Sequence, residues 1–525
     1  MAMGQGLKRA RYPEAPRKVA MLFNDKRPGI IARQFCQLWG AVILCLVCGV
    51  ASAGAWLITP RLGVSEILTD NINLSHENKK KEYITRLVPG VAIKGEGNKL
   101  NMDVDYGLEH LVYEKDSSRD SSYSQLRAHA SADLVKNSLS FNAYSTIRQQ
   151  IVDPENRIVL DNLNPATRSN VLTYSMGPTL KNHFGAYATS ELDFRFGRVI
   201  YSNTDQLANS RITNINLGVS SGRRFGILEW NIKYNNSLTS RGPGDRTKFE
   251  SLTGDLNARV TRRLRFLMRG GILNDDVQAT RGINNGSFLS AGLIWQPSTY
   301  ISVDATAGRN NQDANIAINP SRRTSFQAGY TNRDVGTNPG TRWSLSLLHN
   351  TRRTSWNIGY SEDTTNLQSL EFTGAQALTP DSIGGTQVNP IAIVFTQSDN
   401  DFVRKRLNFG VSLTSAKSTL NINSSFERRD FTQNSDEDKI VSTNASWEWQ
   451  LNPRNSSVTS AGLLNRHFTL DNLDDTYWYA GFSLNRQLQR KLTASINLRH
   501  IERNVTANIN AYQENRLVVG INKQF

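Results

Sequence analysis

The chain has 525 residues, 38% of them apolar and 20% charged, with a formal net charge of +15 at pH 7. A soluble protein of this length would hold roughly two to four domains. The longest apolar window, residues 38–50, is shorter than the roughly 20 residues that a membrane-spanning helix needs, which excludes a bundle of such helices. Phosphate-binding loops and nucleotide motifs are also absent from the sequence, so neither a cofactor nor a nucleic acid partner is expected.

The first 53 residues have the organisation of a signal peptide. Basic residues at positions 18, 26, 27 and 33 precede the apolar window, and Ala51-Ser52-Ala53 follows it. A basic region, a short apolar core and a small-residue end predict export with cleavage after Ala53, from a start at Met1 or Met21. A signal anchor, which would keep this segment attached, is the alternative.

Removing this leader changes the charge and the cysteine content. It carries eight basic and two acidic residues, so residues 54–525 have a net charge of +9. It also carries Cys36, Cys45 and Cys48, the three cysteines of the chain. The exported part therefore has no disulfide, thiolate zinc site or cysteine nucleophile.

From residue 54 onwards the sequence predicts strands throughout. Apolar and polar residues alternate over eight or more positions, which is the pattern of a strand with two different faces. The clearest stretches are residues 301–308, 407–414, 420–427, 478–485 and 492–499. Alternation alone would also fit a soluble sandwich, in which one face meets an apolar core.

The composition of the two faces favours a membrane barrel over a sandwich. Asn, Ser, Thr and Gly dominate the polar face of nearly every strand, as the inner wall of a wide, water-filled barrel requires. The apolar face gathers aromatic residues near strand ends, as expected for girdles at the lipid headgroups. The examples are Trp343, Trp356, Tyr360 and Trp478.

The turns set the number of strands. Short breaks recur about every 39 residues, near Gly97, Asn137, Asn182, Arg223, Arg262, Pro297, Gly336, Pro453 and Arg490. The interval predicts two more, near residues 375 and 414, and longer polar connections lie between the breaks, such as residues 152–168, 274–285, 310–321 and 432–438. Alternating short and long connections are typical of outer-membrane barrels. Eleven short turns predict one all-β, antiparallel transmembrane barrel of about 24 strands (22 to 26) over residues 54–525, with a less regular segment at 364–402.

The last strand carries the features of an assembly signal. Phe525 is a terminal aromatic residue, Val519 and Ile521 share its register, and Gly520 lies five residues before the end. This arrangement resembles the signal that the barrel-assembly machinery reads. Lys523 departs from it, because an apolar residue is usual there, although a lysine close to the interface costs only about 0–1 kcal/mol.

Arginine is the residue type that most suggests binding. The sequence places nine arginines at extracellular strand ends or loops: Arg148, Arg322, Arg323, Arg352, Arg353, Arg428, Arg429, Arg466 and Arg499. Guanidinium groups bind phosphates and carboxylates through two hydrogen bonds, so these residues could form a basic mouth for an anionic glycan or other anions. In the other interpretation, some of these arginines contact lipopolysaccharide phosphates and others form internal ion pairs, such as one between Glu427 and a neighbouring arginine. Basic residues also occur in turns at the opposite end, namely Arg223-Arg224, Arg262-Arg263 and Arg490-Lys491. Because basic residues are thus not confined to one end, the second interpretation is favoured.

Catalytic and metal-binding groups are not evident in the sequence. The seven histidines form no closely spaced ligand pair. Ser, Asn and Asp occur on every strand, so a hydrolytic site at the rim would look the same as the lumen wall. The prediction is a protein that is not an enzyme and has no metal.

Several stretches resemble one family, the outer-membrane proteins associated with the PEP-CTERM/exosortase system. The resemblance rests on Ile58-Thr59-Pro60 with Thr69-Asp70-Asn71-Ile72, on residues 345–363 (LSLLHNTRRTSWNIGYSED), on residues 414–420 (TSAKSTL) and on Glu427-Arg428-Arg429-Asp430. It implies a barrel that works with exopolysaccharide and protein-sorting machinery. It implies no catalytic residues.

Two functions follow as expectations. The first is a porin-like conduit for polar or anionic solutes or glycan across a Gram-negative outer membrane, with both termini in the periplasm. The second is a non-conducting scaffold that docks envelope partners through its loops and residues 364–402. The expected partners are the membrane itself, lipopolysaccharide, the barrel-assembly machinery, and exopolysaccharide or envelope proteins.

Overall fold

The computed structural model describes residues 55–151, 163, 168–202, 208–242, 245–276, 285–336, 339–365, 402–431, 437–469, 473–506 and 511–525. The predicted leader lies outside these residues. The chain divides into two units, and Ala55–Phe525 forms the one that the structure describes. No helix within the described ranges is long and apolar enough to cross a membrane.

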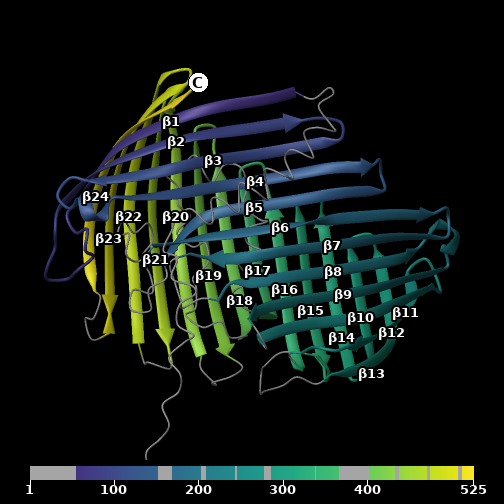
Figure 1. Ribbon diagram of the computed structural model, residues 1–525. Helices are drawn as coiled ribbons and strands as arrows, with labels where there is room; N and C mark the ends of the chain where they lie inside the picture. The colour runs from purple at the N-terminus through teal and green to yellow at the C-terminus, as the bar shows by residue number, and fades with distance from the viewer. Residues whose placement is uncertain are drawn as a thin grey trace, which may run out of the picture. The chain divides into compact units, whose positions relative to one another are not determined.

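The described unit is built from 24 strands (Figure 1). Their bounds are β1 (Ala55–Thr69), β2 (Glu82–Glu96), β3 (Leu100–Tyr113), β4 (Ser121–Val135), β5 (Leu139–Ile151), β6 (Arg168–Phe184), β7 (Ala188–Tyr201), β8 (Ser210–Ser221), β9 (Leu228–Gly242), β10 (Asp245–Arg259), β11 (Leu264–Leu273), β12 (Gly286–Ser298), β13 (Ile301–Arg309), β14 (Asn311–Ser321), β15 (Thr324–Arg333), β16 (Gly340–Asn350), β17 (Thr354–Thr365), β18 (Phe402–Thr414), β19 (Ser418–Phe431), β20 (Glu437–Asn452), β21 (Asn455–Phe468), β22 (Leu473–Gln489), β23 (Leu492–Val505) and β24 (Tyr512–Gln524). Within the described connections lie two single-turn 3-10 helices, η1 (Ser117–Arg119) and η3 (Arg223–Phe225).

The sheet closes on itself. Each strand pairs antiparallel with the next one in the chain, and β24 pairs antiparallel with β1. In Figure 1 the strands of the near wall cross those of the far wall at a steep angle, as the strand tilt of a closed barrel requires. The predicted all-β, 24-stranded antiparallel barrel is therefore confirmed.

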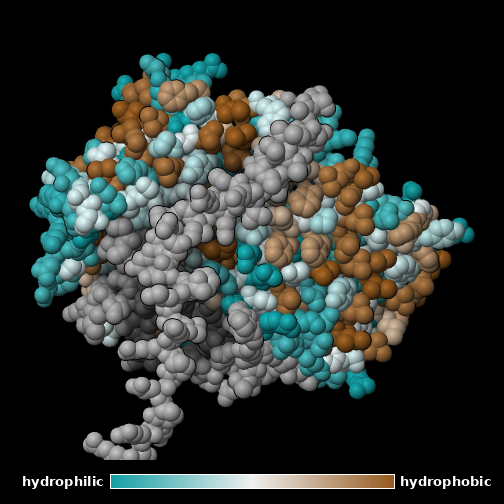
Figure 2. Space-filling model, viewed as in Figure 1, coloured by the Kyte–Doolittle hydropathy of each residue, from teal (hydrophilic) through white to brown (hydrophobic). Residues whose placement is uncertain are grey.

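The outer face of the barrel is apolar. Large exposed hydrophobic side chains occupy the outward register of strands all around the wall, among them Leu62, Leu87, Phe194, Leu217, Ile232, Leu252, Leu293, Leu407, Phe426, Leu463, Phe482 and Leu498. Figure 2 shows such side chains gathered on the outer wall, with hydrophilic residues towards its edges. Exposed tryptophans lie near strand ends, including the predicted Trp343 and Trp356. In a closed barrel every backbone group of the wall is paired between strands, so this face can meet lipid.

The two ends of the barrel differ in their connections. At one end, which we call the short-turn end, strands are joined by two to six residues, as at 97–99, 136–138, 222–227 and 490–491. Ala55 and Phe525 lie at this end, because β1 starts and β24 finishes there. The other end, which we call the long-loop end, carries longer connections such as residues 70–81, 152–167 and 366–401.

Most predicted turns are confirmed, but two stretches were assigned wrongly. Gly336 lies in the connection between β15 and β16 at the long-loop end, whereas the short turns of this region are residues 322–323 and 351–353. Residues 311–321, predicted as part of a loop, form β14, and Asn310 alone joins it to β13 with a φ of 58°. The turn predicted near residue 375 lies outside the described residues.

The cause is a change in strand length. Strands β13 to β16 have only 9 to 11 residues, so their hairpins repeat faster than the 39-residue interval assumed from the sequence. Such strands are long enough to span a bilayer when tilted. The polar side chains that suggested a loop, Asn311, Asp313 and Asn315, alternate on β14 and pair with polar or glycine residues of its neighbours. The strand count stays right because the short turns at 322–323 and 351–353 take the place, in the count, of those predicted near Gly336 and residue 375.

Candidate functional site: the lumen and its mouth

The inner wall is a polar surface held together by bonds between neighbouring strands. Ser425 and Ser442 share a hydrogen bond of 2.7 Å between their hydroxyls, and Thr179 donates one of 2.8 Å to Asp193. Ion pairs of the same kind join Arg127 to Asp103 at 3.3 Å and Arg269 to Asp255 at 2.8 Å, and Arg61 is paired with Asp105. A wall of this composition suits water rather than an apolar core.

One side of the lumen is rich in arginine. We call Arg404, Arg406, Arg429, Arg466, Arg499, Arg503 and Arg516 the arginine wall; all lie in the inward register of β18 to β24. Two cross-strand positions pair like charges, because Arg404 lies directly opposite Arg429 and Arg499 lies directly opposite Arg516. Like charges opposite one another destabilise a sheet. This pattern suits anions where the guanidinium groups are not covered, as at Arg404 and Arg406, whose side chains are 19% and 35% exposed.

Acidic residues neutralise part of the arginine wall. Glu427 accepts a hydrogen bond of 2.5 Å from Arg429 and lies 3.7 Å from Arg406. Asp363 pairs with Arg404 at 3.0 Å, and Glu514 pairs with Arg516 at 2.9 Å. The predicted internal pairing of Glu427 with a neighbouring arginine is confirmed.

The most enclosed pair of this wall is Arg503 with Asp475. Their side chains are 1% and 0% exposed, and two hydrogen bonds of 3.0 Å join the guanidinium to both carboxylate oxygens. Removing a charged pair from water is costly unless the geometry is good, and a two-point contact supplies that geometry. The burial shows that this part of the wall is covered from the lumen side.

A loop from the long-loop end reaches this covered region. Residues 70–81, which we call the mouth loop, join β1 to β2. The Asn71 side chain is fully buried and donates to the carbonyls of Ser75 at 2.8 Å and Gln513 at 2.9 Å. Leu74, with a φ of 51°, packs against an apolar cluster on the inner faces of β20 to β24, formed by Ile440, Leu464, Tyr477, Tyr479, Ile501 and Tyr512.

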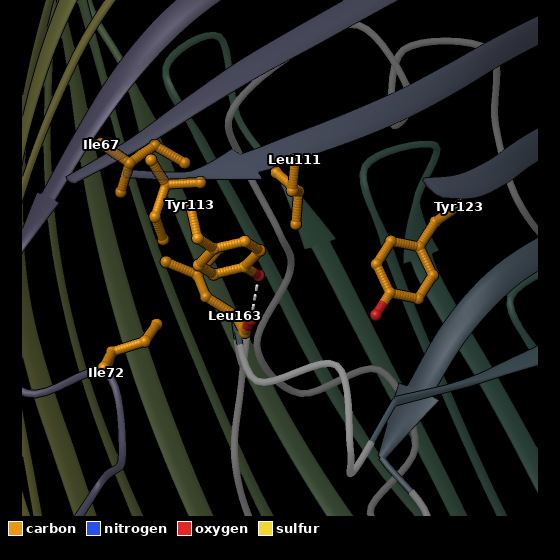
Figure 3. Close-up of a cluster of buried hydrophobic side chains, with 7 residues drawn as sticks. Ile67, Ile72, Leu111, Tyr113, Tyr123 and Leu163 are labelled. Atoms are coloured by element: carbon orange, nitrogen blue, oxygen red, sulfur yellow. Dashed lines mark hydrogen bonds between the residues drawn. The ribbon is translucent and has the colours of Figure 1, made fainter. Parts of the chain in front are cut away.

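A second apolar cluster holds the other side of the mouth loop. Ile72 packs with the inward side chains of β1 to β4, namely Ile67, Ile84, Leu111, Tyr113 and Tyr123 (Figure 3). Leu163, which follows β5 in the chain, joins the same cluster, and the Tyr113 hydroxyl donates a hydrogen bond of 2.5 Å to its carbonyl. The mouth loop and Leu163 thus occupy part of the lumen at the long-loop end. They lie against two neighbouring sections of the wall, β20 to β24 and β1 to β4.

The mouth loop is also tied to the next connection along the rim. Arg119, in η1, donates a hydrogen bond of 2.7 Å to the side chain of Asn73. Arg119 also pairs with Asp116 at 2.9 Å. The hydrogen bond from Ser118, and then that from Arg119, hold the pKa of the Asp116 carboxyl below its ordinary value. The ionised Asp116 thus helps to fix the arginine that holds the mouth loop.

The nine arginines predicted at one end of the barrel do not lie together. Arg322, Arg323, Arg352 and Arg353 are in exposed turns at the short-turn end, so their assignment to the end opposite the short turns is wrong. The misplaced turn at Gly336 caused this error. Arg148, Arg429, Arg466 and Arg499 face the lumen, from strand positions rather than from loops. Their proposed contacts with lipopolysaccharide or glycan stay predictions.

Arg428 shows how one short motif serves both faces. Arg428 lies on the outer face, where it binds Asp430 at 2.8 Å and Glu437 at 2.7 Å. Its neighbours Glu427 and Arg429 form the lumen pair described above. The alternation of a strand therefore separates Glu427-Arg428-Arg429-Asp430 into an inner and an outer ion pair.

The residues of the predicted assembly signal lie at the closure of the barrel. Val519 and Ile521 face outward, and Gly520 lies opposite Ser65, whose Cβ would be 3.0 Å from an added Cβ. The backbone N–H of Phe525 donates to Pro60 at 2.9 Å, and the Lys523 ammonium lies 4.9 Å from the centre of the Phe525 ring.

Sequence reasoning missed the mouth loop and four members of the arginine wall. Arg404 and Arg406 share the register of Asn408 on a predicted strand, so period-2 counting could have assigned them to the lumen. No sequence pattern indicated that the mouth loop turns inward. The clusters that contain or contact Ile72 and Leu74 draw on nine different strands, which are far apart in the chain. Within the described part of the chain, no group of three or more His, Cys, Asp or Glu side chains could hold a metal ion.

A closed barrel with an apolar outer face and a polar lumen defines the class: this is an outer-membrane β-barrel protein. No family model and no curated protein matches the chain.

Several solved structures are similar to it. The FrpB iron transporter from Neisseria meningitidis, in its F5-1 apoprotein form, aligns with a TM-score of 0.45 and 10% identity over 92% of this chain and 82% of that one. The siderophore receptor PirA from Pseudomonas aeruginosa gives a TM-score of 0.41 and 10% identity over 89% and 80% of the two chains. A loop-deletion mutant of OmpT from Vibrio cholerae gives 0.26 and 8% over 57% and 99%. At these values the likeness does not extend to function.

Proposed function

We propose that this protein is a conduit for polar or anionic solutes whose opening at the long-loop end is controlled by the mouth loop. The observation that carries the proposal is the inward turn of the mouth loop, in which Ile72 and Leu74 pack against apolar clusters on the inner faces of the strands. A barrel that served only as a scaffold would need neither a polar lumen nor a loop folded into it. The orientation that we propose has the short-turn end in the periplasm, as is usual for outer-membrane barrels.

The solutes are glycans or other anions of the exopolysaccharide and protein-sorting system that the sequence motifs suggest. Three of these motifs lie at features described above. Thr69-Asp70-Asn71-Ile72 begins the mouth loop, residues 345–363 span the turn between β16 and β17, and Glu427-Arg428-Arg429-Asp430 contributes to the arginine wall. Their positions support a link between these motifs and the lumen.

Conductance across a planar bilayer tests the conduit. The unmodified protein is compared with a variant in which residues 72–79 are replaced by two glycines. We expect stepwise conductance that rises severalfold in the variant, because the loop no longer occupies the lumen. Insertion of one glycine into the turn at 415–417 is the control and should leave the step size unchanged. No steps from either the unmodified or the loop-deleted protein would refute the proposal.

Ion selectivity tests the role of the arginine wall. Under a potassium chloride gradient, the sign of the reversal potential reports whether anions or cations pass more readily. We expect anion preference in the loop-deleted protein, reduced by Arg404→Gln with Arg406→Gln. Arg198 and Arg211 face outward from β7 and β8, so Arg198→Gln with Arg211→Gln is the matched control. If both double variants shift the potential equally, the arginine wall does not select the solute.

The scaffold hypothesis rests on residues 364–402. Residues 366–401 lie outside the part of the chain that the structure describes, so no observation favours it over the conduit.

A further inference from the structure

The connections of the short-turn end carry basic residues and no acidic ones. Nine of the eleven contain Lys or Arg, and none contains Asp or Glu. We call these 14 residues the basic ring: Lys99, Lys136, Arg223, Arg224, Arg262, Arg263, Arg322, Arg323, Arg352, Arg353, Lys417, Arg454, Arg490 and Lys491. Every member is exposed.

This pattern is not a reflection of the chain's composition. The whole sequence has 46 acidic residues for 61 basic ones, so a random set of turns would mix the two signs. The connections of the opposite end do mix them, since Asp70, Glu77 and Asp116 occur there beside Lys81 and Arg119. Among the described residues, no ion pair joins a member of the basic ring to an acidic side chain. The ring therefore presents 14 positive charges without an ion-pair partner in the described part of the chain.

The length of the turns fixes the level at which these charges lie. A connection of two to six residues that must return to the sheet extends only about 10 Å beyond the strand ends. Exposed aromatic residues lie just inside the ring on the outer wall: Trp56, Trp295, Trp356, Trp449 and Phe525. Such a belt marks the boundary between lipid tails and headgroups. The ring then lies within the headgroup layer, which is about 5–7 Å thick on each side.

The charges act on that layer rather than on the lumen axis. Strands roughly 4.8 Å apart and tilted by about 40° give a 24-stranded barrel a diameter of roughly 45–50 Å. The axis is then more than 20 Å from the turns, while electrostatic interactions are screened over about 8 Å in physiological salt. A solute on the axis would feel little of the ring. Phosphates in the adjacent headgroup layer would be in direct contact with it.

We propose that the basic ring binds the phosphates of anionic phospholipids in the leaflet at the short-turn end. Paired arginines at 223–224, 262–263, 322–323 and 352–353 suit phosphate oxygens, which accept two hydrogen bonds from one guanidinium. Anionic headgroups attract basic segments that lie within a Debye length of the surface. The identity of this leaflet as the periplasmic one rests on the orientation given under the proposed function. The lipid binding itself does not depend on conduction.

Lipid retention after reconstitution tests the proposal. The protein is placed in vesicles of phosphatidylethanolamine and phosphatidylglycerol in a 3:1 ratio, extracted gently, and its bound lipids are counted by native mass spectrometry. The unmodified protein should retain phosphatidylglycerol above its share in the vesicle. The variant with Arg322, Arg323, Arg352 and Arg353 all changed to Gln should retain at most half as much. A control with four charges removed from the outer face near the long-loop end, Arg198, Arg211, Lys405 and Lys439 to Gln, should match the unmodified protein.

Three outcomes would overturn the proposal. The ring variant could retain as much phosphatidylglycerol as the unmodified protein, or lose both lipids equally. It could also lose binding of inorganic polyphosphate, measured in parallel, while its lipid retention stays unchanged; the partner would then be a soluble polyanion. Conductance is recorded on the same preparations. Phosphatidylglycerol enrichment in a protein that does not conduct supports the lipid proposal and contradicts only the conduit.

Discussion

The two ends of this barrel use arginine in opposite ways. At the short-turn end, arginines such as Arg352 and Arg353 are exposed in tight turns with no acidic partner among the described residues. Towards the long-loop end, Arg503 and Arg516 are buried against the inner wall, and each is paired with a carboxylate. The same residue type therefore serves as a charged surface at one end and as internal structure at the other.

The difference follows from what covers each end. Short turns cannot fold over the lumen, so their side chains stay in contact with water and headgroups. The mouth loop is long enough to bring Ile72 and Leu74 back onto the wall, and water is excluded where they settle. A charge in such a place needs a partner. The comparison predicts that equivalent changes have unequal effects at the two ends.

The largest effect should come from the enclosed ion pair. Arg503→Ala leaves Asp475 buried and unpaired, which should lower the free energy of unfolding by about 3–5 kcal/mol. The exposed comparator Arg353→Ala should change it by less than about 0.5 kcal/mol. Urea unfolding of the barrel in lipid vesicles, followed by tryptophan fluorescence, measures both. Equal losses would show that the two ends do not differ in the way described.

A smaller effect is expected where the mouth loop is anchored. Leu74→Gly removes the apolar contact and keeps the positive φ of 51°, which glycine adopts without strain. Loss of a partly buried leucine side chain is worth about 1–2 kcal/mol, so the loop should detach roughly tenfold more often. Single-channel recording measures this as a higher open probability. Leu74→Met keeps an apolar side chain and should behave as the unmodified protein; a similar gain in both variants would exclude anchoring by Leu74.

The smallest of the three concerns one hydrogen bond. Tyr113→Phe removes the hydroxyl that donates to the Leu163 carbonyl inside a buried cluster, at a cost of about 1 kcal/mol. Tyr187→Phe, in an exposed turn at the short-turn end, should have no measurable effect. The same urea titration compares them. If Tyr187→Phe lowered the free energy of unfolding as much as Tyr113→Phe does, the proposed difference in burial between the two ends would be contradicted.

Much of the wall could be predicted from the sequence because a strand in a membrane barrel has only local requirements. Each residue must face lipid or lumen, and alternation along the chain records that choice directly. This is why residues 478–485 and 492–499 were assigned correctly to β22 and β23, and why the strand number came out right. Strands β13 to β16 are shorter, so the assumption of one short turn about every 39 residues misplaced the turns in this region. For the same reason, Arg322, Arg323, Arg352 and Arg353 were assigned to the wrong end of the barrel.

The site depended on contacts that are far apart in the chain. Thr69 donates a hydrogen bond of 2.7 Å to Glu514, and Asn71 reaches Gln513, across more than 440 positions. Such pairings exist only because β24 closes the barrel against β1. The sequence by itself determined which face of each strand is apolar and that the tight turns are basic. Only the tertiary structure decided that the mouth loop turns inward at Asn71, Ile72 and Leu74 and which arginines are covered, because both depend on surfaces that closure of the barrel creates.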